Sequence, residues 1–362
     1  MISKNDKRLY WIIFGVVSLL IRYFLKGHSE IVETYYSRGF FQFVRFVSDW
    51  AIGWLPLPGL YLLIILVLPL LIWRLVTFVK KIDGFLTRVL QIVISLLATV
   101  CGVIGIFLWF WGFNYLRIPI EDQMSIQPRP LSTNELKEEL NLFTIDIIAA
   151  REAIPFVDNN AFTKENLPDN LIEEIQNSVS DRMSSIGYPT SRNLPVRTLL
   201  RGTLLRIGTA GFYLPFTGEC NIDNGLHALQ KPHVLAHEMA HGQGIGDEGS
   251  CNFIALLSCI NSENAFIRYS GLLAFYRTLA VNYRRQRPEE YKLFRSNLPK
   301  GIIADLDAIN ANSRSYPDIF PKLRDQTYDA FLKTQGIKEG MKNYNRVIVL
   351  ERAYRLKIKT ID

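Results

Sequence analysis

The chain has 362 residues, which is enough for two domains or for one domain and a membrane part. Its net charge is +7, and its apolar residues are concentrated in the first third of the sequence. The sequence contains no zinc ribbon, glycine-rich phosphate loop or basic–aromatic stripe, so we expect no nucleic-acid partner.

Three apolar segments predict transmembrane helices at about 9–25, 59–79 and 89–113. The second and third reach the roughly 20 residues that a bilayer requires. Basic residues precede the first, but no small-residue cleavage site follows it, which favours a retained anchor over a cleaved signal peptide. We therefore expect a membrane domain over 1–116 with the lipid bilayer as its partner. The segment 30–50 is either an interfacial amphipathic helix or a short helix packed on the membrane bundle.

The positive charges give a divided signal for topology. Lys4, Lys7 and Arg8 precede the first span, and Lys80, Lys81 and Arg88 lie between the second and third. In a three-span count these two clusters cannot both be cytoplasmic unless the segment 30–50 re-enters or crosses the membrane. If the second cluster decides, the chain is a multi-pass protein of the cytoplasmic (inner) membrane with its soluble domain on the outer, periplasmic face. A cytoplasmic soluble domain is the alternative.

A proline-containing linker is expected at 117–131 and a soluble domain at 132–362. Ser132 and Glu135 have the spacing of a capping box at the start of a helix. The stretch 198–213 is β-like, and most of the remainder has helical periodicity. The expected fold is mainly α with a small β-sheet, of the α+β class.

The motif His-Glu-Met-Ala-His occupies residues 237–241. On a helix, His237 and His241 share one face, one turn apart, and Glu238 lies beside them. This is the zincin arrangement, with two imidazoles on Zn²⁺ and the glutamate as general base. The alternative is an amphipathic helix with two surface histidines. Three glycines at 242–246 predict that the helix ends directly after the second histidine.

The third metal ligand is expected from the carboxylates that follow. Asp247 has the spacing of the metzincin ligand, six residues after His241. Glu248 is followed four residues later by Asn252, as in the gluzincin pattern, where Asn252 would orient a ligand histidine. We favour Glu248, and Asp247 would then cap the next helix.

Other residues are candidates for the cleft. The strand at 198–213 could bind substrate backbone as an added strand, with Tyr213 or Glu219 facing the cleft. The candidate donors to an oxyanion are Tyr213, His227, His233 and Tyr269.

Several stretches together resemble a family of uncharacterised bacterial membrane proteins, domain of unknown function 3810. They are the membrane block, YSRGF at 36–40, GFYLPFTGE at 211–219, the HEMAH motif with Glu248 and Asn252, and YSG at 269–271. The resemblance covers nearly the whole sequence. It implies a membrane-anchored, zincin-like protein and supplies no substrate.

From the sequence we predict a membrane-anchored zinc metallohydrolase, most simply a peptidase acting on a peptide or protein. Glu238 would take the proton from a zinc-bound water as that water attacks the carbonyl. The alternative is a catalytically silent, membrane-tethered zincin-fold protein that binds or senses, although metal binding alone does not need Glu238.

Overall fold

The computed structural model describes residues 6–155 and 158–361, so Lys4 and both ends of the sequence lie outside the described residues. The chain is mainly helical, at 71%, with a small three-stranded sheet, as the sequence predicts. It forms two compact units. The first comprises residues 1–118 and 214–219, and the second comprises 119–213 and 220–362.

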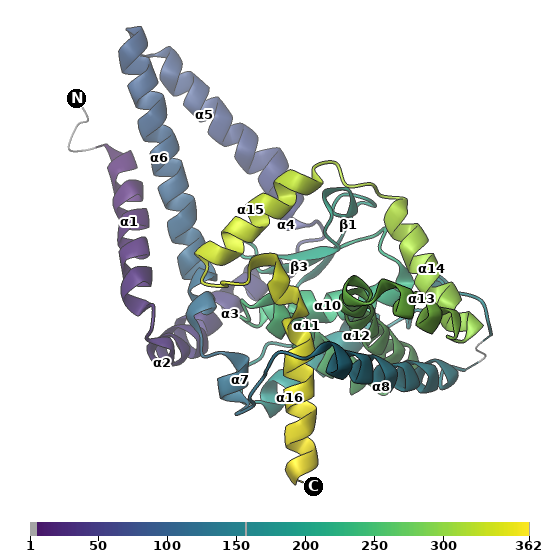
Figure 1. The fold of residues 1–362 in the computed structure, drawn as a ribbon. Coiled ribbons are helices and arrows are strands. Elements are labelled where there is room, and N and C mark those ends of the chain that lie inside the picture. Colours follow the sequence, from purple (N-terminus) through teal and green to yellow (C-terminus); the bar gives the residue numbers. More distant parts are fainter. Residues whose placement is uncertain (1–5, 156–157, 362) are drawn as a thin grey trace. The chain divides into compact units, whose positions relative to one another are not determined.

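The first unit is helical, and Figure 1 shows its elements in purple and blue. Its elements are α1 (Lys7–Leu25), α2 (Ser29–Ile31), the π-helical η1 (Val32–Phe40), α3 (Phe41–Ile52), α4 (Gly59–Leu62), the π-helical η2 (Leu63–Val67), α5 (Leu68–Lys80), α6 (Phe85–Phe110) and the 3₁₀ turn η3 (Gly112–Leu116).

Three helices of this unit are long and apolar enough to cross a membrane. They span Lys7–Leu25, Gly59–Lys80 and Phe85–Phe110, within a few residues of the predicted bounds. Most side chains of the second are exposed and only Gly59 in it is buried, as expected for a helix that faces lipid. Residues 6–155 and 158–361 therefore contain three candidate membrane spans.

Small residues allow α1 and α6 to pack closely. A Cβ atom on Gly15 would lie 2.4 Å from the Cys101 carbonyl oxygen, and one on Gly105 would lie 2.4 Å from the Phe14 ring. The indole of Trp109 also donates a hydrogen bond to the Ser18 hydroxyl, at 3.1 Å. Contacts of this kind hold helices together in lipid, where apolar burial gives no net advantage.

The segment from α2 to α3 packs on the membrane helices, in agreement with the second of the two interpretations. The Tyr36 hydroxyl donates to the carbonyls of Leu108 and Trp109, and Arg117 forms a buried ion pair with Glu33 at 2.7 Å. The buried side chains of Tyr36 and Glu33 thus have partners on the far side of the contact, as burial requires.

The loop 214–219 belongs to the first unit. The Glu219 carboxylate is fully buried and accepts hydrogen bonds from the Gly59 amide, at 2.8 Å, and from the Thr217 hydroxyl, at 2.7 Å. Gly59 is the first residue of the second candidate span. The loop is therefore fixed at one end of that span.

The second unit contains the remaining helices and most of the sheet (Figure 1), whose end residues Leu214 and Glu219 belong to the first unit. Its elements are α7 (Ile120–Gln123), α8 (Thr133–Glu152), η4 (Lys164–Asn166), α9 (Leu171–Ser185), β1 (Val196–Leu199), η5 (Leu205–Ile207), β2 (Gly211–Leu214), β3 (Glu219–Asp223), η6 (Ala228–Gln230), α10 (Lys231–Gly242), α11 (Glu248–Ile260), α12 (Ala265–Gln286), α13 (Pro288–Ser296), α14 (Lys300–Arg314), α15 (Pro321–Thr334), η7 (Gly340–Asn345) and α16 (Arg346–Ile361).

The sheet has the order β1-β3-β2, with β1 parallel to β3. The β-like stretch 198–213 is strand only at its two ends. Between them, Gly202 and Gly208 have positive φ, and the Asp223 carboxylate accepts the Gly202 and Leu204 amides at 2.8 and 2.7 Å. These side-chain bonds compete with sheet pairing and turn the chain into η5 instead.

The helices α8 to α12 pack around one apolar core. Phe143 of α8 and Phe275 of α12 meet edge to face, with ring centroids 4.5 Å apart. The capping box of α8 forms as predicted. The expected linker 117–131 contributes to this core as well, because Ile120 and Ile126 are buried in it. That stretch is therefore a packed part of the unit.

Candidate metal centre

Helix α10 carries the motif and ends directly after it. His237 and His241 lie one turn apart, with their rings 4.8 Å from centre to centre. Gly244 has φ +88°, which side chains rarely adopt, and the Ile245 amide donates back to the Ala240 carbonyl at 3.1 Å. This is a Schellman-type end, and it turns the chain back towards the second histidine.

Glu248, the first residue of α11, meets both imidazoles. Its Oε2 lies 3.1 Å from His237 Nε2 and 3.4 Å from His241 Nε2. One ligand atom from each of the three residues falls within 4.8 Å of the others, and all three residues are buried. This group could hold a metal ion.

The Nδ1 atom of each imidazole, the nitrogen that does not face Glu248, has its own hydrogen-bond acceptor. His237 Nδ1 donates to the Asn252 side-chain carbonyl at 2.9 Å, and His241 Nδ1 donates to the Ile245 carbonyl at 2.8 Å. These bonds fix the tautomer in which Nε2 is the free ligand atom. Asn252 thus contacts His237, as its spacing from Glu248 predicts.

Two tyrosines from the C-terminal elements complete the surroundings. The Tyr328 hydroxyl of α15 donates to Glu248 Oε1 at 2.5 Å. Tyr344 of η7 stacks on His237, with an interplanar angle of 8°, and its hydroxyl lies 3.3 Å from that of Tyr328. The second oxygen of Glu248 is therefore held by a neutral donor, which leaves Oε2 to face the imidazoles.

The charge state of Glu248 follows from these contacts. Burial alone would raise the pKa of its carboxyl, but the charges and hydrogen bonds of His241 and His237 outweigh burial and hold the pKa well below its ordinary value. Glu248 is therefore an anion at neutral pH, as a metal ligand must be.

Asp247 is occupied elsewhere. It is the N-cap of α11, and its carboxylate accepts the Ser250 amide, the Asn343 side-chain amide and the Arg346 guanidinium, each at 2.7 Å. The structure thus brings Glu248, and not Asp247, to the two histidines.

Glu238 lies against the sheet. The backbone N–H of Tyr213 in β2 donates to its carboxylate, and a Cβ atom on Gly211 would lie 2.9 Å from its Oε1. Its other oxygen, Oε2, is buried and has no hydrogen-bond partner within the described part of the chain. Burial raises the pKa of this carboxyl to about 7. Glu238 is therefore poised to accept a proton near neutral pH.

The other predicted cleft residues fall in different places. Tyr213 meets Glu238 through its backbone, while Glu219 is bound to Gly59 in the first unit. His233 lies one turn before His237, and burial, with the nearby His237, lowers its pKa to about 3, so it is neutral. The hydroxyl of Tyr269 is taken by Asp305, at 2.8 Å.

His227, the remaining predicted donor, precedes η6. Its Nδ1 accepts the Leu229 amide at 3.3 Å, and burial lowers its pKa. That nitrogen is therefore engaged in capping a turn.

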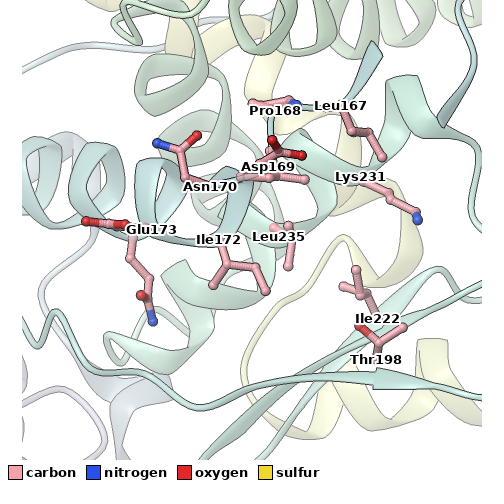
Figure 2. A pocket seen from close by; sticks show the side chains of 12 residues that line it. Leu167, Pro168, Asp169, Asn170, Ile172, Glu173, Thr198, Ile222, Lys231 and Leu235 are labelled. Carbon is pink, nitrogen blue, oxygen red and sulfur yellow. The ribbon is translucent and has the colours of Figure 1, made fainter. Parts of the chain in front are cut away.

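A cavity of about 450 Å³ lies beside the first half of α10, and Figure 2 shows its lining. Lys231 and Leu235 line it from α10, Thr198 and Ile222 from the sheet, and residues 167–176 from the start of α9. The three metal-binding candidates do not line it. The cavity therefore lies apart from the candidate metal centre.

Sequence reasoning missed Tyr328 and Tyr344. Tyr328 lies 80 residues beyond Glu248, and no short spacing connects either tyrosine to the motif. The only signal was their position in basic stretches with helical periodicity, which indicates packing as readily as function.

Comparison with known proteins gives the family and nothing more specific. No curated protein and no solved structure matches the sequence. One family matches, described as "Protein of unknown function (DUF3810)", over residues 36–350. That range covers most of the first unit and nearly all of the second, including the candidate metal centre. The chain therefore belongs to the DUF3810 family.

Proposed function

We propose that this protein is a membrane-anchored zinc metallohydrolase of the zincin type, and most simply a peptidase. The main support is the position of Glu238, a buried carboxylate whose Oε2 has no hydrogen-bond partner among the described residues. It lies beside the buried group of His237, His241 and Glu248. A protein that only held a metal would have no use for such a group.

The residues fit zinc. Imidazole nitrogen and carboxylate oxygen are common zinc ligands, and both histidines present Nε2 while their Nδ1 atoms are held. Three protein ligands are typical of a catalytic zinc site, whereas structural zinc has four. A zinc ion bound there would supply a Lewis acid that activates water and polarises a carbonyl.

Glu238 acts in the proposal as general base and then as general acid. Its carboxylate takes a proton from the attacking water and passes it to the leaving amine. The Tyr213 amide and the close approach of Gly211 fix the orientation of the carboxylate.

Tyr344 is the best candidate to stabilise the developing oxyanion. Its ring stacks on His237, and its hydroxyl, unlike that of Tyr328, is not bonded to Glu248. Burial, and after it the negative charge of Glu248, raises the pKa of Tyr344 well above its ordinary value, so its hydroxyl stays protonated at neutral pH. A neutral tyrosine at this position can donate a hydrogen bond to a new negative charge.

The sheet supports a peptide as the substrate. β2 is at one edge of the described sheet, and its backbone lies against Glu238. An extended peptide can add to such an edge by main-chain hydrogen bonds, which would bring its carbonyl groups past the base.

The test is the variant Glu238→Gln, which keeps the size of the side chain and removes its basicity. We expect the purified full chain in detergent to cleave members of a quenched fluorescent peptide library when loaded with zinc, and the variant to lose this activity while binding zinc as before. Glu263→Gln, in the short turn before α12, is the matched control. Equal cleavage rates for Glu238→Gln and the wild type would show that Glu238 is not the base.

A further inference from the structure

Four exposed apolar side chains of the second unit lie on two segments that are far apart in the sequence and adjacent in the fold. Ile207 is 46% exposed, Ile319 56%, Phe320 62% and Leu323 59%. The Ile319 amide donates to the Arg206 carbonyl at 2.9 Å, which joins the turn η5 to the start of α15. We call these four side chains the apolar patch.

A buried aromatic ring fixes this junction. Tyr316 precedes the patch, and the guanidinium groups of Arg201 and Arg206 lie 5.7 and 6.0 Å from its ring centre. A Cβ atom on Gly202 would lie 3.2 Å from the same ring. The two segments are therefore held together by packing, and the patch is a formed surface.

Three basic residues lie on the same two segments as the patch, while the carboxylates there, Asp318 and Asp325, are both paired with Arg324. Arg201, Arg206 and Lys322 are all exposed. Within residues 6–155 and 158–361, neither Arg206 nor Lys322 takes part in an ion pair. Apolar side chains beside unneutralised cations are typical of a surface that enters the headgroup region of an anionic membrane.

We propose that the apolar patch and the basic residues beside it bind the surface of the bilayer in which the same chain is anchored, through anionic lipid. This goes beyond the proposed hydrolase function and does not depend on it.

The course of the chain supports lipid as the occupant. Ile207 precedes Leu214 by seven residues, and at Leu214 the chain enters the first unit. There the loop 214–219 is bound by Glu219 to Gly59, the first residue of a candidate span. The patch is thus joined by a short stretch of chain to a point where a span ends, and a span ends at a membrane surface.

The surface also has a connection to the metal centre. Helix α15 carries Leu323 in the patch and Tyr328 on Glu248. Five residues apart, the two side chains point about 140° away from each other on the helix. Contact with lipid would hold α15 from the side opposite to the metal centre.

The test uses a spin label on the full chain in lipid nanodiscs. All four native cysteines are buried, so a cysteine introduced at the surface can be labelled alone. In discs of phosphatidylcholine and phosphatidylglycerol at three to one, a label at Leu323→Cys should collide more with oxygen, which prefers lipid, than with a water-soluble nickel chelate. Ile319→Cys provides a second, independent label.

The matched control is Leu293→Cys on α13, whose side chain is 69% exposed and lies outside the patch. Its label should collide more with the nickel chelate. The double variant Arg206→Glu, Lys322→Glu should move the Leu323 label towards the control value, as should discs of phosphatidylcholine alone.

Labels at 319 and 323 that match the control in anionic discs would overturn the proposal. Dipolar broadening from a second copy of the chain at this surface would also overturn it. Unchanged lipid contact after charge reversal would contradict the role of anionic lipid.

Discussion

At the scale of single residues, the candidate metal centre is organised by groups that hold its histidines. His237 is oriented by Asn252, and His241 by the Ile245 carbonyl. That carbonyl is in place because α10 ends at Gly242 and the left-handed backbone of Gly244 turns the chain back. Each imidazole is thus presented in one tautomer before any metal arrives. Such preparation lowers the entropy cost of assembling the site.

Asn252→Ala should therefore weaken zinc binding by roughly 10–100-fold, because the His237 ring loses the acceptor that fixes it. Zinc affinity of the full chain in detergent, measured by competition with a chelating dye, is the appropriate readout. Asn193→Ala, at an exposed turn, serves as the control. Equal affinities for Asn252→Ala and the wild type would show that the bond has no orienting role.

Tyr344→Phe should lower kcat by about 100-fold and leave zinc content unchanged, since a lost oxyanion donor affects the transition state and not the ground state. The experiment compares kcat and bound zinc with those of Tyr35→Phe, which alters an exposed tyrosine of the first unit. If Tyr344→Phe loses zinc instead, the tyrosine supports the site through packing on His237.

At the scale of elements, the sequence was informative where a pattern is local. The three apolar helices, the capping box of α8 and the end of α10 after its second histidine all depend on residues within a turn or two of each other. Patterns of this range can be read from the order of residues alone.

The stretch 198–213 shows where such patterns stop. Its apolar residues make it β-like, yet Asp223 binds the backbone of the intervening turn and the strands form only at the ends. Tyr328 likewise reaches Glu248 from α15 by tertiary packing. Contacts of this kind join residues that are far apart in the chain, so no local sequence pattern predicts them.

A buried carboxylate on α16, that of Glu351, should make the stability of the fold depend on pH. Burial raises the pKa of Glu351 to about 7, although Arg355 at 2.9 Å opposes the shift. The unfolded chain releases this proton at lower pH than the folded chain does. Stability should therefore be greatest below the ordinary pKa of a glutamate and should fall as pH rises towards 7.

Glu351→Gln removes the titration. The unfolding free energy of the variant minus that of the wild type should be about 3 kcal/mol larger at pH 8 than at pH 4, because only the wild type loses stability as Glu351 ionises. Urea denaturation of the full chain in detergent at both pH values measures this, with the exposed Glu289→Gln as control. A difference between variant and wild type that does not change with pH would mean that Glu351 is ionised throughout.

At the scale of the whole molecule, if all three candidate spans cross a membrane, the chain before the first and the chain after the third lie on opposite sides of it. The basic residues Lys80, Lys81 and Arg88 crowd the short connection between α5 and α6. Short basic loops stay in the cytoplasm, so we propose that the second unit lies on the outer face of the cytoplasmic membrane.

An alkaline phosphatase fused to the carboxyl end should then be active in bacterial cells, and a green fluorescent protein fused at the same point should be dark. Fusions after Lys81 should give the opposite pair of results and provide the internal control. A fluorescent carboxyl-terminal fusion with an inactive phosphatase would place the proposed hydrolase in the cytoplasm.

The central claim is that His237, His241 and Glu248 bind a metal ion, and two neighbouring carboxylates allow a direct test. Zinc content of the purified full chain should be close to one ion per chain, measured by mass spectrometry after removal of loosely bound metal. Glu248→Ala should lose the ion, since it removes a ligand that meets both imidazoles. Asp247→Ala should retain it, with a loss of about 1 kcal/mol in stability from the missing helix cap. Retention of zinc by Glu248→Ala, or its release by Asp247→Ala alone, would contradict this assignment of the site.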